Sequence, residues 1–172
     1  MQLATLPMVA VFSVAGVALL VVAAWRDIAV RTIPDLISLG VLGIGIATRV
    51  VLGPGALLAS LAGALLLFCL LVFLHGRGMM GGGDVKLATA VAVGLAPVDC
   101  YYFFVATALF GGIHGVIYLV LSGFIGRKTS GPRDSLLRRI RNVESQRIRR
   151  RKSLPYGCAI ALGGASVLLR SL

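Results

Sequence analysis

The chain has 172 residues, of which 58% are hydrophobic, and its mean hydropathy is +0.97. These values exclude an ordinary soluble domain and indicate a membrane protein that crosses the bilayer several times. The formal net charge is +11, from 17 Lys and Arg residues against 6 Asp and Glu residues. Spanning helices need about 20 residues each. We therefore expect one all-α membrane domain over residues 1–172, a bundle of about six transmembrane helices with no second soluble domain.

Apolar stretches taken in chain order predict six helices, over residues 7–25, 36–52, 56–74, 85–96, 101–125 and 155–169. The fourth is short for a crossing unless its helix begins inside the preceding glycines. Residues 26–35 are expected to form a short polar link. Tight turns are expected at Gly53-Pro54-Gly55 and at 97–99. The spacing of Gly111 and Gly115 favours close helix packing.

The basic residues lie almost entirely on one predicted side of the bundle. The loops after the first, third and fifth helices hold nearly all of the 17 Lys and Arg residues, and 126–153 is the richest segment. The positive-inside rule makes this side cytoplasmic. Two interpretations of 126–153 stay open: a basic amphipathic helix on an anionic membrane surface, or a disordered cytoplasmic loop.

Two further features bear on the compartment and on metals. The three cysteines, Cys69, Cys100 and Cys158, form no CxxC pair, so neither a disulfide framework nor a zinc site is expected. No Lys or Arg precedes the first apolar run, which argues against a cleaved signal peptide.

Asp84 is the first candidate for chemistry. It follows three consecutive glycines and lies between long apolar runs, where an ionisable group is costly and therefore a functional candidate. Asp27 is the second candidate, because it is predicted on the same side of the membrane. Two carboxylates held close together share one proton, so that one can take a proton from water while the other polarises an amide. This is aspartic proteolysis, and it needs no metal or organic cofactor.

Other roles for these two residues remain open at this point. Asp27 adjoins Arg26 and precedes Arg31 by four positions, which would also suit a surface ion pair. Asp84 could instead be the N-cap of a helix that begins at a glycine turn.

The remaining polar residues are weaker candidates. Asp35 after Pro34 suits the positive N-terminal end of the second helix. Lys86 is either a neighbour that supports Asp84 or an ordinary interfacial cation. His75 and His114 lack partners at metal-ligand spacing, so packing or interfacial roles are expected for both.

Three motifs resemble those of a known family. Gly81-x-Gly83-Asp84 resembles the GxGD motif of membrane aspartyl proteases, the type that includes presenilin and signal peptide peptidase. The longer segment 81–87 is more similar to the type IV prepilin peptidase family. Asp27 with the segment 31–35 resembles the first catalytic segment of that family.

Pro155-Tyr156-Gly157 resembles a third family feature, at the start of the last helix. The three motifs stand in the family's order and cover the whole predicted bundle. Each lies at a predicted cytoplasmic helix end.

The resemblance implies a bacterial inner-membrane endopeptidase. Such enzymes remove the leader peptide of type IV prepilin-like precursors, cutting after a glycine at the cytoplasmic membrane face. Asp27 and Asp84 would be the catalytic pair. The residues expected to support them are Gly81, Gly83, Lys86, Pro34, Asp35, Pro155, Tyr156 and Gly157. The expected partners are a prepilin-like substrate and anionic lipids at the basic loop, with no nucleic acid and no cofactor.

The chain departs from the family pattern in two ways. Asp35 stands where Asn is common, and we expect the chain to be without the cysteine-containing cytoplasmic domain of the larger members. The sequence therefore resembles the short form that serves Flp-type pili, for which no methyltransferase activity is expected. A non-catalytic membrane scaffold or a small proton-coupled transporter is the alternative class. A proton relay would favour acids near the bilayer midplane, whereas both candidates are predicted at helix ends.

Overall fold

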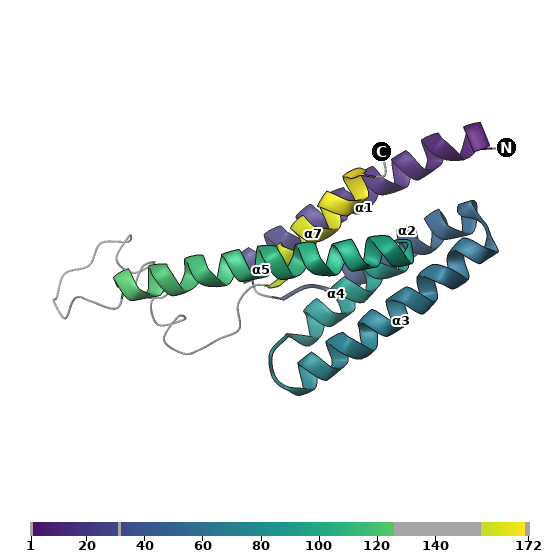
Figure 1. Ribbon diagram of the computed structural model, residues 1–172. Helices are drawn as coiled ribbons and strands as arrows, with labels where there is room; N and C mark the ends of the chain where they lie inside the picture. Colours follow the sequence, from purple (N-terminus) through teal and green to yellow (C-terminus); the bar gives the residue numbers. More distant parts are fainter. Residues whose placement is uncertain (1, 31, 126–155, 171–172) are drawn as a thin grey trace. The chain divides into compact units, whose positions relative to one another are not determined.

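The computed structural model describes residues 2–30, 32–125 and 156–170, and all elements in these ranges are helices (Figure 1). The helices are α1 (Gln2–Val30), α2 (Asp35–Leu52), α3 (Pro54–Gly76), α4 (Gly82–Val93), α5 (Pro97–Ile125) and α7 (Tyr156–Arg170). Four of them, α1, α2, α3 and α5, contain stretches long and apolar enough to cross a membrane. These observations confirm the predicted all-α fold.

The first helix is longer than predicted. α1 continues to Val30, so the predicted polar link over 26–35 is wrong for its first half. Polar side chains alone do not end a helix, and this segment has no breaker before Pro34. A proline disfavours helical backbone at the residue before it, which fits an extended link just ahead of α2. Asp27 consequently lies inside α1, about one turn from its end.

The two predicted turns have different outcomes. Gly53 joins α2 to α3 with a φ of 110°, a backbone conformation that L side chains rarely adopt, and Pro54 follows within the first turn of α3. The turn expected at 97–99 is wrong, because these residues form the first turn of α5. Proline is well placed there, since the first N–H groups of a helix have no partner within the helix.

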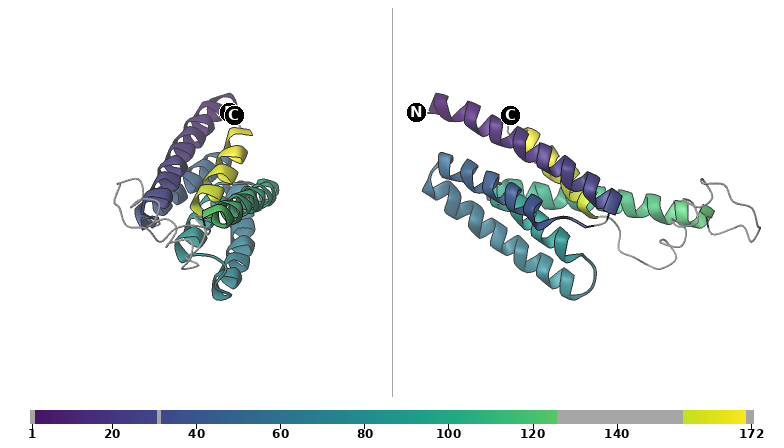
Figure 2. Two further views of the ribbon diagram at one scale, coloured as in Figure 1. Left: turned by 90° about the vertical axis from the view of Figure 1, so that its left-hand side faces the viewer. Right: turned by 180° about the vertical axis from the view of Figure 1, so that it is seen from behind.

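The short helix α4 lies at the centre of the packing. It contacts α2, α3 and α7, while α1 packs against α2 and α7 (Figures 1 and 2). Eight of its 12 residues are buried, among them Leu87 and Val91. Its small side chains, mostly alanine and valine, allow neighbouring helices to approach closely. α4 is therefore a buried helix surrounded by longer ones.

Two glycines bring the backbone of α2 close to the end of α4. A Cβ added at Gly45 of α2 would lie 2.9 Å from both the Cα and the N of Gly94, which follows α4. Side chains cannot be accommodated where two backbones approach this closely. Gly111 of α5, which the sequence analysis singled out for close helix packing, lies against Tyr156 and Ala159 of α7.

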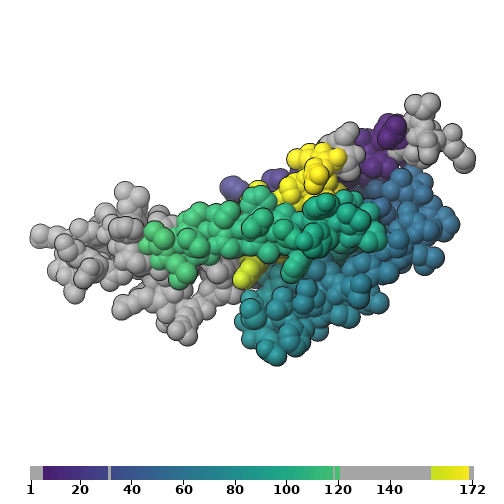
Figure 3. Space-filling model, in the orientation of Figure 1, coloured from purple at the N-terminus to yellow at the C-terminus, as the bar shows by residue number. Residues whose placement is uncertain are grey.

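Large apolar side chains cover the outer face of α3, which lies at the surface of the described bundle (Figure 3). Leu65 is 61% exposed and Leu66 is 75% exposed. An exposed apolar face of this length is costly in water and natural in lipid. Together with the four long apolar helices, it makes the chain a multi-pass membrane protein.

The chain divides into two parts. One part comprises residues 1–111 and 155–172, and the other comprises 112–154. The first contains α1 to α4, the start of α5 and α7, and everything below concerns this part. The second begins with the C-terminal half of α5, which carries exposed apolar side chains such as Ile113 and Leu119. The basic segment 126–153 lies outside the described residues, so both interpretations of it stay open.

Candidate active site

Asp84 is positioned by the glycine turn that begins α4. Gly81 is the N-cap residue and Asp84 lies in the first turn, so the N-cap alternative for Asp84 is wrong. Its carboxylate accepts a hydrogen bond from the backbone N–H of Gly81. This is the reciprocal half of a capping box, in which an acid three residues into the helix satisfies a free N–H at its start. The bond orients a carboxylate that is only 9% exposed.

Gly81 is required by this geometry. A Cβ at position 81 would lie 2.9 Å from Oδ2 of Asp84, closer than real Cβ contacts come. An alanine here would displace the carboxylate or strain the turn. Gly83 is less constrained, since its nearest neighbour would be Ile33 at 3.8 Å. The steric need for a glycine is therefore clearer at position 81 than at position 83.

Asp27 belongs to α1, and its side chain lies against the start of α7. It is 5% exposed, so it does not lie at the surface, where the ion-pair interpretation had placed it. A Cβ at Gly157 would lie 2.6 Å from Oδ2, 2.8 Å from Cγ and 2.9 Å from Cβ of Asp27. The first turn of α7 therefore lies directly against this carboxylate. One residue further on, Cys158 Sγ lies 3.8 Å from the carbonyl oxygen of Ala24 and continues the contact with α1.

The fold brings the two carboxylates together. Asp84 lies outside the four long apolar helices. The pKa of its carboxyl is raised to about 6. The larger cause is burial and the second is the negative charge of Asp27, while the hydrogen bond from Gly81 acts in the opposite direction. A like charge acts in this way only at short range in a poorly hydrated site. Asp27 and Asp84 are also the only two buried acids in the part of the chain that the structure describes. They form a coupled pair.

The link before α2 packs on the turn that carries Asp84. Ile33 faces Gly83, and Pro34 is the N-cap residue of α2. Lys86 Nζ donates hydrogen bonds to Asp35 Oδ1 at 2.8 Å and to Oδ2 at 3.0 Å. The structure thus pairs Lys86 with Asp35 and ties the start of α2 to the start of α4.

The Lys86–Asp35 pair is exposed, with side chains 59% and 68% accessible. Exposed ion pairs contribute at most about 1 kcal/mol. If the chain cleaves the precursor that the motifs imply, we expect Asp35→Asn to leave the cleavage rate within about threefold, because asparagine keeps one acceptor oxygen for Lys86. Initial rates of the variant and the unchanged protein, measured in the same vesicles, test this. A loss of a hundredfold would show that the Asp35 charge itself matters.

One contact was not foreseen from the sequence. His75 Nδ1 lies 2.8 Å from the carbonyl oxygen of Met80, to which its N–H donates. His75 also lies beside Gly82, with Cε1 at 3.6 Å from the position of an added Cβ. The bond spans the turn between α3 and α4, where Gly78 has a φ of 71°. A histidine a few residues before a glycine run is the only sequence signal for it, and this signal is weak.

The other predicted residues have simpler positions. Tyr156 is half-buried with its ring against Gly111, and Pro155 lies outside the described residues. His114 lies in the second part of the chain. Within the described ranges, no three His, Cys, Asp or Glu side chains converge as metal ligands do.

Fold and site together define a multi-pass membrane protein with a coupled pair of buried acids at one end of its bundle. Residues 14–116 match the model of the type IV leader peptidase family, which is more than half of the 172 residues. The chain belongs to this family of peptidases, as the motifs indicated. The matched range includes Asp27 and Asp84 and ends before α7. Searches of curated proteins and of solved structures found no match.

Proposed function

We propose that the protein is an aspartic endopeptidase that removes the leader peptide of type IV prepilin-like precursors of the Flp type. The cut follows a glycine at the cytoplasmic face of a bacterial inner membrane. The observation that carries the proposal is the coupling of two buried carboxylates, Asp27 and Asp84, at the same end of the bundle. Membership of the leader peptidase family supports the substrate class.

The pair performs the reaction through one shared proton. The raised pKa of Asp84 favours it as the protonated member, and Asp27 is then the ionised one. Asp27 takes a proton from water as the water oxygen attacks the scissile carbonyl carbon. Asp84 gives its proton to the carbonyl oxygen. When the tetrahedral intermediate collapses, the C–N bond breaks and the leaving nitrogen takes the proton from Asp27. One hydroxyl of the intermediate returns its proton to Asp84, so the pair again holds one proton.

The orientation rests on charge. Asp27 and Asp84 adjoin the segments that follow the first and third predicted helices, and these segments are on the side predicted to hold most Lys and Arg residues. The positive-inside rule favours the cytoplasm for that side. The basic segment 126–153 would then face anionic headgroups, each basic side chain near the surface contributing about 1 kcal/mol. A proton-coupled transporter or a scaffold is the weaker alternative, because both acids lie near helix ends and the family is one of peptidases.

Cleavage of a defined precursor tests the proposal. The purified protein in lipid vesicles is incubated with a prepilin-like precursor, and the product is sequenced from its new N-terminus. We expect one cut directly after the glycine at the leader boundary, and none when that glycine is replaced by a bulky residue. Absence of cleavage for every Flp-type precursor of the host would contradict the proposal.

The pH dependence of this reaction follows from the Asp84 pKa. The pair works with one proton, which is lost as the pH rises through the raised pKa of about 6. We therefore expect the upper limb of the pH–rate profile to lie near pH 6, instead of near the ordinary aspartate value of about 4. Single-turnover rates across the pH range measure it, with Asp35→Asn as a control that leaves the limb in place. A limb near pH 4 would show that neither burial nor the charge of Asp27 raises the pKa of Asp84 in the working protein.

A further inference from the structure

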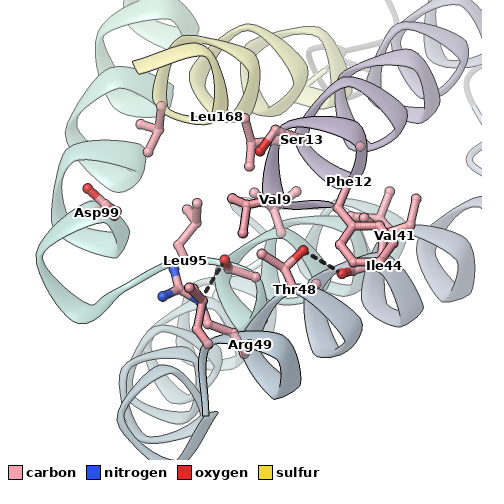
Figure 4. Close-up of a pocket in the computed structure, with 16 residues that line it drawn as sticks. Val9, Phe12, Ser13, Val41, Ile44, Thr48, Arg49, Leu95, Asp99 and Leu168 are labelled. Carbon is pink, nitrogen blue, oxygen red and sulfur yellow. Dashed lines mark hydrogen bonds between the residues drawn. The ribbon is translucent and has the colours of Figure 1, made fainter. Parts of the chain in front are cut away.

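A cavity of about 180 Å³ lies at the end of the bundle away from the acid pair (Figure 4). Its lining comes from the N-terminal half of α1, the C-terminal parts of α2 and α7, the end of α4 and the start of α5. Asp84 is at the opposite end of α4 from Gly94, about 15 Å away at a rise of about 1.5 Å per residue. The cavity is therefore separate from the proposed catalytic site.

The cavity has an apolar wall. Its main members are Phe12, Val41, Ile44, Leu95 and Val167, which come from three helices, α1, α2 and α7, and from the turn after α4. This wall exists because Gly45 and Gly94 bring α2 against the end of α4. An apolar wall of this kind favours a hydrocarbon portion in the ligand.

Two opposite charges also line the cavity. Arg49 is half-buried, and its Nε donates a hydrogen bond to the carbonyl oxygen of Gly94 at 2.9 Å. This bond fixes the guanidinium group and leaves its two terminal nitrogens for other acceptors. Asp99, in the first turn of α5, also lines the space (Figure 4).

Arg49 and Asp99 are near enough for their charges to interact. Among the described residues, however, no ion pair within 4 Å joins them. Two complementary charges that line one cavity without an ion pair between them leave room for a ligand that carries both a cation and an anion. Thr48 does not compete for it, since its hydroxyl donates to the carbonyl oxygen of Ile44 at 2.8 Å.

The combination of groups selects an amphiphile. The planar guanidinium suits a phosphate, to which it can donate two parallel hydrogen bonds. The carboxylate of Asp99 suits an ammonium group. The cavity is also at the level of the helix ends, where α2 stops at Leu52 and α5 starts at Pro97, and lipid headgroups lie at that depth.

We propose that this cavity binds one zwitterionic phospholipid of the phosphatidylethanolamine type. Arg49 receives its phosphate, Asp99 receives its ammonium group, and the apolar wall receives the first carbons of one acyl chain. A cavity of about 150 Å³ admits benzene, so this volume holds that part of a lipid while the rest of the chains stays in the bilayer. The bound lipid would fill the space between α1, α2, α4 and α7.

Photolabelling of the full chain tests this site. The protein is placed in vesicles of phosphatidylethanolamine and phosphatidylglycerol that contain phosphatidylethanolamine with a diazirine near the acyl carbonyl. After irradiation and digestion, mass spectrometry locates the label. We expect it on peptides covering 9–16 and 41–52, above the level found on the lipid-facing residues Leu65 and Leu66.

Three variants make the result specific. Arg49→Gln is expected to reduce this labelling about tenfold or more, since a charge-assisted hydrogen bond to phosphate is lost. Val41→Phe fills the wall and keeps both charges, and it is expected to remove the label as well. Arg170→Gln is the matched control, because Arg170 is an exposed arginine at the end of α7 whose guanidinium lies 5.2 Å from the Tyr102 ring centroid. The Arg170→Gln variant should be labelled to the same extent as the unchanged protein.

The opposite results are equally clear. Labelling of the cavity peptides no stronger than that of Leu65 and Leu66 in the unchanged protein would overturn the proposal. An equal loss in Arg170→Gln and Arg49→Gln would overturn it too, because the effect would then come from surface charge. Complete displacement of the label by inorganic phosphate would assign the cavity to a free anion instead of a lipid. Retention of precursor cleavage by each variant shows that it is folded.

Discussion

Replacing either Asp27 or Asp84 by asparagine is expected to abolish precursor cleavage, with a fall in rate of about a thousandfold or more. Asparagine has the size of aspartate and much of its hydrogen bonding, but it cannot ionise or carry the shared proton. Asp84→Asn keeps an oxygen that can accept the Gly81 N–H, so the start of α4 should stay in place. Both variants should be folded, because each replaces an ionisable group in a buried site, where a charge is costly, by a neutral group of the same size.

The double variant separates a coupled pair from two independent groups. If Asp27 and Asp84 act as a unit, losing the second acid after the first costs almost nothing more. We expect Asp27→Asn with Asp84→Asn to be no slower than either single variant. Single-turnover cleavage of a precursor with glycine at the leader boundary measures the three rates. Substantial cleavage by either single variant would refute the catalytic assignment.

Conservative acids provide the complementary control. Glutamate keeps the charge and moves the carboxyl group by one methylene. A displacement of this order can cost about a hundredfold in rate. Asp84→Glu would also lose the fit to the Gly81 N–H that holds the carboxylate. Partial activity in these variants, beside none in the asparagine variants, would show that the carboxyl chemistry itself is needed.

Much of the fold could be predicted from the sequence, because the length of an apolar run directly reflects bilayer thickness. The short fourth helix was predicted over 85–96, with a start inside the glycines only as the condition for a crossing, and the structure has it at Gly82–Val93. The end of α1 was missed, since three charged residues resemble a loop although nothing before Pro34 breaks the helix. Here backbone geometry, and not polarity, determines where the helix stops.

The contacts that build the site were harder to predict from the sequence. The sequence pointed to Asp27 and Asp84 through motif resemblance and charge, but pairing of Lys86 with Asp35 joins residues 51 positions apart. The approach of Gly157 to Asp27 is longer still in sequence. Such contacts depend on how helices pack, and helix periodicity does not specify which side chain on a neighbouring helix is met. The His75 bond to Met80 is local but has no recognised pattern.

The close approach of α7 to Asp27 leads to the second prediction of large effect. Gly157→Ala is expected to reduce precursor cleavage about a hundredfold, by moving the Asp27 carboxylate away from its position beside Asp84. The new methyl group would lie 2.6 Å from Oδ2 and 2.9 Å from Cβ of Asp27, so a side-chain rotation alone cannot relieve the overlap. Either the carboxylate or the start of α7 must shift.

Two other glycines distinguish this effect from general damage. Gly43→Ala is the neutral control, because no atom lies within 4 Å of the added methyl group and alanine favours a helix more than glycine does. Gly45→Ala is the stability control, since its methyl group would meet the backbone of Gly94, far from the acids. Overpacking of this kind costs about 1–3 kcal/mol. We expect Gly45→Ala to lower the thermal unfolding temperature more than the cleavage rate.

Gly157→Ala should show the reverse pattern, a large loss of rate with a smaller loss of stability. Cleavage rate and unfolding temperature, measured on the same vesicle preparations, give both quantities for each variant. If Gly157→Ala cleaves as fast as Gly43→Ala, then the first turn of α7 does not hold Asp27, and Asp27 is positioned by α1 alone. If instead Gly157→Ala loses rate only in proportion to stability, as Gly45→Ala does, then the contact supports the bundle and not the carboxylate. The expected separation of the two quantities follows from the contact itself, because the atoms that an added methyl group would displace are those of Asp27.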